Sequence, residues 1–227
     1  MVPVTPKSDH REPFPVSPQW GSIFGMSVMS RLRKSLPEGV DPSRLPPGQY
    51  NTKRFPVLHV GYTPKVKLEK WDFKVEGLVK TPVTWSFEEM TSLPRAEQVC
   101  DIHCVTKWSK FDTRWEGIAV ADVLSQLELL PEATHVLVQA EHGFTSNLSL
   151  EDFSRPQNLF ATKYDGKPLA PDHGWPMRLV VPHLYFWKSA KWVRGLRFID
   201  ADQPGFWERN GYHMRGDPWA EERYWGD

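Results

Sequence analysis

The sequence predicts one mixed, strand-rich α+β domain with few short helices. Three observations indicate this fold class: segments that alternate apolar and polar residues, helix signals that are all short, and a high content of proline and tryptophan. The chain of 227 residues contains 21 Pro and 11 Trp. Proline removes backbone donors and ends helices, and indole rings fill large irregular spaces. This composition is therefore typical of a loop-rich fold.

The hydrophobic pattern predicts four strands. Residues 71–77 alternate with a period of two and end at a glycine, which is typical of a half-buried strand followed by a turn. Residues 135–140 and 177–181 are apolar runs that we expect to form buried strands. Residues 193–199 are expected to form another strand, with Arg194 and Arg197 facing solvent.

Helix signals occur at three places and are short. Ser86 is expected to be an N-cap with Glu89 as its capping-box partner, and Pro94 ends this helix. A second helix is predicted over residues 120–129, and a single turn over residues 149–153. Between the predicted elements there is no internal repeat.

The chain divides into a Pro-rich N-terminal arm, residues 1–49, and a domain over residues 50–227. The arm contains nine prolines, which leave only residues 23–34 free to form a helix. We expect the arm to lie over the domain or to be partly disordered. The pattern of the sequence changes from about Arg54 onward, close to the start of this domain.

Charge and composition exclude several classes of protein. With 28 Lys+Arg and 28 Asp+Glu, the chain has no net charge to attract nucleic acid or an anionic membrane. No apolar run is long enough to span a bilayer, and no segment has the order of a signal peptide. We therefore expect a cytoplasmic protein with no membrane span and no nucleic-acid partner.

The two cysteines, Cys100 and Cys104, are open to several interpretations. A disulfide is excluded, because four extended residues span about 13 Å and a bridge allows about 7 Å between Cα atoms. A zinc site with His103 would lack the usual second pair of ligands. Cys104 as the nucleophile of a hydrolase would need a histidine and an acid from elsewhere. Burial as small apolar residues and thiolate binding to a soft redox metal also remain open.

A basic segment lies near the C-terminus. Between Asp172 and Asp200 there are five Lys or Arg residues and no acid, although the chain as a whole is neutral. Interleaved Gly, Pro and Trp favour a loop with exposed amides, which suits a phosphate and a flat ring system. The alternative is a solvated basic strand edge.

Six motifs in this order resemble the molybdopterin domain of the sulfite oxidase family, in its small single-domain prokaryotic branch. They occupy residues 54–59, 101–109, 115–118, 143–147, 173–182 and 187–192. The resemblance extends from about residue 45 to the end of the chain. It implies a sulfite oxidase-type molybdopterin-binding fold and the molybdenum cofactor, with molybdenum or with tungsten in its place.

The resemblance also implies roles for particular residues. Cys104 would be the metal ligand and catalytic residue, since a thiolate is a soft ligand. Cys100 lies outside the motif and is expected to pack. The implied cofactor contacts are His59, His103, Thr145, His173, Arg178, His183, Ser189 and Lys191.

The implied activity is two-electron oxygen-atom transfer on a small substrate, at sulfur or nitrogen. Only Lys107 follows Cys104 where sulfite oxidases have arginines that hold sulfite, so we expect a different substrate. The chain has no haem-attachment motif, so electrons are expected to pass to or from a separate partner protein. The alternatives are a catalytically silent binding or assembly module of the same fold, and a cysteine-dependent hydrolase.

Overall fold

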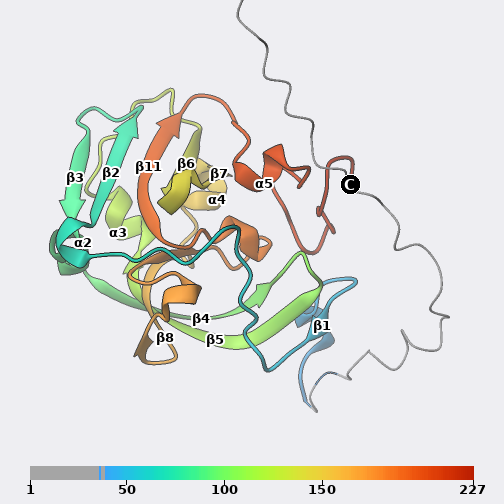
Figure 1. The fold of residues 1–227 in the computed structure, drawn as a ribbon. Helices are drawn as coiled ribbons and strands as arrows, with labels where there is room; N and C mark the ends of the chain where they lie inside the picture. The colour runs from blue at the N-terminus through green and yellow to red at the C-terminus, as the bar shows by residue number, and fades with distance from the viewer. Residues whose placement is uncertain (1–35, 37–38) are drawn as a thin grey trace, which may run out of the picture. The chain divides into compact units, whose positions relative to one another are not determined.

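Two β-sheets and a few short helices make up the part of the chain that the computed structural model describes, residue 36 and residues 39–227 (Figure 1). Residues 23–34, the part of the arm that its prolines leave free to form a helix, lie outside these residues. Among the described residues, no helix has the length and apolar character needed to cross a membrane. The strand-rich fold class with short helices is confirmed.

The first sheet has five strands in the order β3-β2-β11-β6-β7. Their bounds are β2 Asp72–Gly77, β3 Val83–Ser86, β6 His135–Ala140, β7 Thr145–Ser149 and β11 Val193–Ile199. Strands β11 and β2 are parallel, and the other pairs are antiparallel. Three of the four predicted strands, β2, β6 and β11, lie side by side in this sheet.

The second sheet has six strands, with β1, β5, β8 and β10 in order, β4 paired to β5 and β9 paired to β8. The bounds are β1 Tyr50–Asn51, β4 Arg95–His103, β5 Trp108–Ala119, β8 Leu159–Tyr164, β9 Lys167–Pro168 and β10 Arg178–Val180. Strands β4 and β5 form a long hairpin that curves beneath the first sheet in the view of Figure 1. The turn of this hairpin contains Cys104.

Short helices connect the strands. The α-helices are α2 Phe87–Ser92, α3 Val120–Leu124, α4 Leu150–Phe153 and α5 Phe206–Arg209. The 3₁₀ turns are η1 Pro42–Arg44, η2 Leu68–Lys70, η3 Glu141–Gly143, η4 Pro171–His173 and η5 Phe186–Lys188. The capping box of α2 is confirmed, because the Ser86 hydroxyl accepts from the Glu89 amide at 3.2 Å and the Glu89 carboxylate accepts from the Ser86 amide at 2.7 Å.

Helix α3 is shorter than the sequence predicts. It ends at Leu124, and the following residues turn back to pair with another segment: the Lys80 amide donates to the Glu128 carbonyl at 2.8 Å, and Leu129 forms a bridge with Val79. Tertiary pairing therefore takes the backbone groups that a longer helix would have used.

The apolar side chains form two clusters. The larger lies against the first sheet and includes Phe73, Val138 and Phe198, all fully buried. The smaller lies against the second sheet and includes Trp115, Tyr185 and Cys104. The candidate site lies beside this second cluster.

Candidate active site

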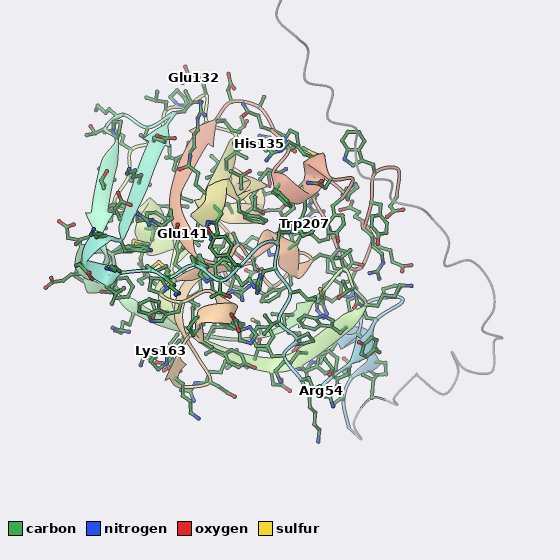
Figure 2. All side chains as sticks on the ribbon, in the orientation of Figure 1. Arg54, Glu132, His135, Glu141, Lys163 and Trp207 are labelled. Carbon is green, nitrogen blue, oxygen red and sulfur yellow. The ribbon has the colours of Figure 1, made fainter. Side chains whose placement is uncertain are left out.

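A cavity of about 330 Å³ forms where the β4–β5 turn, the residues after β10 and helix α5 come together. This volume falls within the usual range for small-molecule sites. Its apolar walls include the aromatic residues Phe55, Phe144, Phe186, Phe206, Trp207 and Tyr212. Figure 2 shows two of the lining residues, Trp207 on α5 and Glu141 just after β6.

Cys104 opens the tight turn between β4 and β5. Its amide donates to the Trp108 carbonyl at 2.8 Å, and its carbonyl accepts from the Lys107 amide at 2.9 Å. Lys107 has a positive φ of 75°, which closes the turn. The Cys104 thiol lines the cavity, and its sulfur lies 3.1 Å from the Thr106 hydroxyl. Burial raises the pKa of this thiol, so a thiolate here needs a cation such as a metal ion beside it.

Two cations, Arg178 and Lys191, line the cavity without a carboxylate partner among the described residues. The buried Arg178 guanidinium donates to the carbonyls of His173 at 3.0 Å and Ser189 at 2.9 Å. The Lys191 ammonium donates to the carbonyls of Leu58 and Asp172, each at 2.9 Å. Carbonyls satisfy the N–H groups without forming an ion pair, and the charge of the Asp172 carboxylate offsets only part of the burial of Lys191.

The electrostatics of this group favour an anion. Burial lowers the pKa of Arg178 to about 9, so the guanidinium is still charged at neutral pH. Burial and the charge of Arg178 lower the pKa of Lys191 to about 7. Burial and these two cations lower the pKa of His173 to about 4, so its imidazole is neutral. A bound phosphate would accept bonds from the cations and restore full charge to Lys191.

One orphaned polar atom of the cavity wall also fits a polar ligand. The indole nitrogen of Trp108, a residue of that wall, is buried without a hydrogen-bond partner. Buried donors in native proteins are nearly always bonded, so this N–H is suited to a ligand that offers an acceptor. The hydroxyl of Thr145 is also buried without a partner, but Thr145 is not a residue of the wall. The donor set, the thiol and the cations together fit a molybdenum pterin with its phosphate.

Six of the nine predicted site residues line this one cavity. They are His59, Cys104, His173, Arg178, Ser189 and Lys191. The side chain of Ser189 also acts within the protein, because its hydroxyl accepts from the Val181 amide at 2.9 Å. These residues come from four separate stretches of sequence, which the fold brings together.

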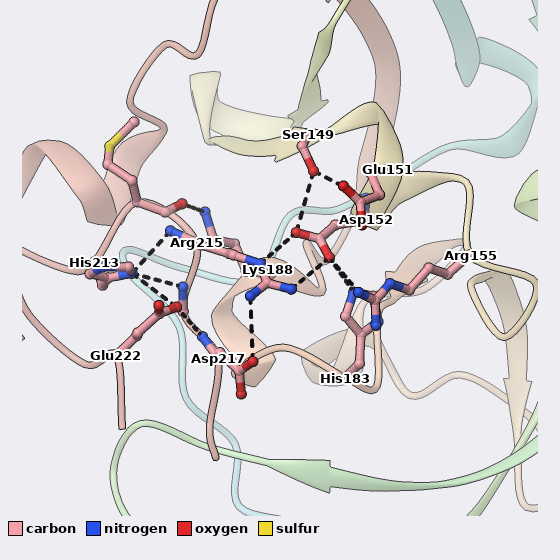
Figure 3. A network of polar contacts seen from close by, with 12 residues as sticks. Ser149, Glu151, Asp152, Arg155, His183, Lys188, His213, Arg215, Asp217 and Glu222 are labelled. Atoms are coloured by element: carbon pink, nitrogen blue, oxygen red, sulfur yellow. Dashed lines mark hydrogen bonds and ion pairs between the residues drawn. The ribbon is translucent and has the colours of Figure 1, made fainter. Parts of the chain in front are cut away.

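The structure places His103, Thr145 and His183 outside the cavity wall. The ring of His103 is buried, contacts the Ser109 hydroxyl at 2.8 Å and packs edge-on against Trp219. His183 lies 3.1 Å from the Asp152 carboxylate, within the polar network of Figure 3. An acid therefore holds His183 away from the cavity.

The other three basic residues of the segment, which do not line the cavity, differ in their surroundings. Lys188 is fully buried and pairs with Glu208 at 2.7 Å. The expectation that Arg194 faces solvent is wrong, because it forms ion pairs with Asp72 and Glu141. These acids come from β2 and η3, which the sequence pattern did not bring near Arg194. Arg197 is exposed, as expected.

The other interpretations of the cysteines find no support in the described residues. No group of three His, Cys, Asp or Glu side chains there is arranged to hold a metal, which disfavours a zinc site of Cys100, His103 and Cys104. The side-chain partner of the Cys104 sulfur is Thr106 and not a histidine, which disfavours the hydrolase. Cys100 packs against the second cluster, 3.7 Å from the Thr113 hydroxyl, which confirms its predicted packing role.

The aromatic wall of the cavity was not predicted from the sequence. Phe206, Trp207 and Tyr212 belong to a C-terminal stretch that shows no regular period. The rings of Trp207 and Tyr212 stack at 4.9 Å. The only signal in the sequence was the density of aromatic residues there.

Comparisons with known proteins find a family and several relatives for this chain. A family model described as the oxidoreductase molybdopterin binding domain matches residues 59–207. The uncharacterized oxidoreductase YuiH of Bacillus subtilis (strain 168) is 50% identical over 185 residues, which cover 81% of this chain and 93% of that protein.

More distant relatives carry more specific names. The protein-methionine-sulfoxide reductase catalytic subunit MsrP of Gluconobacter oxydans (strain 621H) is 27% identical over 178 residues, 68% of this chain and 57% of the relative. This chain thus spans a little over half of that protein. The crystal structure of the sulfane dehydrogenase SoxCD from Paracoccus pantotrophus matches with a TM-score of 0.59 and 19% identity, over 72% of this chain and 46% of that one. This likeness shows the fold.

Proposed function

The chain belongs to the oxidoreductase molybdopterin-binding domain family and is a molybdopterin-dependent oxidoreductase, and from this we propose that it transfers one oxygen atom to or from a small neutral substrate. One observation supports this most. The cavity holds a thiol suited to the metal and, in the same wall, two basic side chains that form no ion pair among the described residues and are suited to the phosphate. The bound cofactor supplies the two-electron redox change.

Different residues of the chain would hold the metal, the phosphate and the pterin of the cofactor. The Cys104 thiolate would hold the metal, since it is soft and the turn directs it into the cavity. Arg178 and Lys191 would bind the phosphate, the arginine by two parallel bonds and the lysine as a point charge. Neutral His173 would bond the edge of the pterin.

The cavity favours a neutral substrate. Among the described residues, Arg178 and Lys191 are the only Lys or Arg residues in its wall, and the phosphate would occupy both. The remaining wall is largely aromatic and would exclude water around the substrate. Sulfite would find no free cation there, whereas the oxide of a thioether or an amine needs none. The name of the methionine-sulfoxide reductase relative supports sulfur as the reacting atom. We expect electrons to come from a separate partner protein.

Two cysteine variants test the proposal. In a host that makes the pterin, we expect about one molybdenum per chain and reduction of small sulfoxides or amine oxides with a chemical electron donor. Cys104→Ser should abolish turnover while the chain stays folded, because a hydroxyl is a harder and more basic ligand than a thiolate. Cys100→Ser should keep activity close to that of the wild type.

Metal content, circular dichroism and turnover of both variants provide the measurement. An active Cys104→Ser enzyme would contradict the ligand assignment. Bound molybdenum without turnover on either class of oxide would favour the silent binding module instead.

A further inference from the structure

The C-terminal segment 212–227, here called the C-terminal strap, lies outside the family match, which ends at residue 207. No role is assigned to it by the motifs that predicted the site. It nevertheless reaches the turn that carries Cys104. The contact is made by Arg223, a cation that is only 8% exposed.

Arg223 bonds directly to the Cys104 turn. Its guanidinium donates to the carbonyl of Val105, the residue after Cys104, at 2.9 Å and to the carbonyl of Pro47 at 3.2 Å. The same group lies over the ring of Tyr185, 4.9 Å from its centroid, and forms a long ion pair of 3.5 Å with the exposed carboxylate of Glu221, which solvent screens. A planar guanidinium can hold two carbonyls and a ring face at once, which an ammonium cannot.

The segment before β1 holds the other side of the turn. The buried Gln49 amide donates to the Cys104 carbonyl at 3.1 Å, and the Tyr50 amide donates to the Lys107 carbonyl at 2.9 Å. Together with Arg223, these bonds fix three of the four carbonyls of the turn, those of Cys104, Val105 and Lys107. The direction of the Cys104 side chain follows from this backbone.

The strap is bonded both to the domain and within itself. The Tyr185 amide donates to the Gly216 carbonyl at 2.8 Å, and the Asp227 carboxylate accepts from the backbone amides of Arg223 at 3.0 Å and Tyr224 at 2.6 Å. Trp219 packs edge-on against His103, the residue before Cys104, with ring centroids 4.9 Å apart. Arg223 therefore approaches the turn from an anchored backbone, so its contacts cost little additional ordering.

We propose that Arg223 is a positioning residue of the molybdenum site. By holding the Val105 carbonyl it fixes the turn that aims the Cys104 sulfur into the cavity, and its charge acts on the metal that this sulfur binds. This inference rests on the assignment of Cys104 as the ligand. Removing the cation should loosen the turn and favour the oxidised metal, because a nearby positive charge stabilises the more reduced and more negative state.

The test compares Arg223→Gln and Arg223→Lys with a matched control, Arg114→Gln. Arg114 is an exposed arginine on β5 that pairs with Glu97 at 2.7 Å, away from the cavity wall. In the cofactor-free full chain, Arg223→Gln should raise the hydrogen-exchange rates of the amides in residues 104–107 at least tenfold, as expected for the loss of a charge-assisted bond. In the molybdenum-loaded enzyme it should change the paramagnetic resonance spectrum and lower the midpoint potential.

Arg223→Lys keeps the charge but bonds one carbonyl, so it should restore most of the potential and only part of the exchange protection. The proposal would be overturned if Arg223→Gln had the hydrogen-exchange rates, the paramagnetic resonance spectrum and the midpoint potential of the wild type. If Arg223→Gln does not fold, Arg223→Lys decides, and wild-type exchange with a wild-type spectrum in that variant would overturn it. A wild-type spectrum in Cys104→Ser would instead reject the ligand assignment of the proposed function.

Discussion

Two groups of basic side chains differ in what they contact. In the cavity, Arg178 and Lys191 donate only to backbone carbonyls. In the network of Figure 3, three basic residues converge on the carboxylate of Asp152, namely Arg155, His183 and Arg215. The first group keeps its charge available for a ligand, whereas each member of the second group already has a carboxylate partner.

The network differs from the cavity because it contains the carboxylate of Asp152. Burial alone would raise the pKa of Asp152, but bonds from His183 and Arg215 outweigh it and hold the pKa well below the usual range. Asp152 also bonds the hydroxyl of Ser149 at 3.3 Å and joins α4 to the C-terminal strap through Arg215. We therefore expect the basic residues of the cavity to serve binding and those of the network to serve stability, according to the presence of a carboxylate.

The largest expected effect comes from removing a cation from the cavity. Arg178→Met should lower cofactor retention at least tenfold, because it would remove two charge-assisted bonds to the phosphate of roughly 1.5–3 kcal/mol each. Arg178→Lys should recover only part, since an ammonium lacks the planar two-point geometry. Bound pterin per chain provides the measurement.

Arg215→Met is the matched control in the network. It should lower stability and leave the amount of bound pterin per folded chain unchanged. Because Arg178 also holds the carbonyls of His173 and Ser189, the unfolding free energy of each cofactor-free variant must be measured alongside. Equal pterin content in Arg178→Met and Arg215→Met would remove the distinction between the two groups.

The next effect concerns Asp152. Asp152→Asn should lower the unfolding free energy by about 2 kcal/mol at pH 7, as expected for charge-assisted bonds at a buried carboxylate. The folded pKa of Asp152 lies below its unfolded value of about 3.9, so the stabilisation is complete above that pH and is lost as the pH falls below it.

Denaturant unfolding at pH 7 and pH 3 measures this effect. The difference between wild type and Asp152→Asn should shrink at pH 3, while pterin binding at pH 7 is the same in both. A difference that is constant with pH would show that the charge of Asp152 is not what stabilises the network.

Much of the fold follows from local sequence patterns, and the missed parts have a physical cause. Strands β6 and β11 have the predicted bounds, because their apolar residues face one buried cluster. Strand β4 was not predicted, since Arg95–His103 is mostly polar and half exposed. It is stabilised by its antiparallel pairing with β5, which a local pattern does not reveal.

The site, like the fold, was predicted only in part from the sequence. The motifs and the run of basic residues predicted Cys104, Arg178 and Lys191 as site residues, and these line one cavity. They did not reveal which basic residues have an acid nearby, since Glu208 and Asp72 are distant in sequence from Lys188 and Arg194. Ion pairing between distant segments is a property of the fold. It determines which basic residues are paired with an acid and which are available for a ligand.

The smallest expected effect separates Arg194 from Arg197, two arginines of β11. Arg194 pairs with Asp72 and with Glu141 at 2.7 Å and is partly exposed, whereas Arg197 is exposed on the same strand. Arg194→Ala should lower the unfolding free energy by about 1 kcal/mol, and Arg197→Ala by less than about 0.5 kcal/mol, because exposed charges contribute little. Since Glu141 lines the cavity, freeing its carboxylate also places an unpaired negative charge in the wall and should reduce pterin binding slightly in Arg194→Ala alone. Parallel denaturation and pterin measurements on both variants would show this, and equal pterin content would mean that charge at Glu141 does not reach the cofactor.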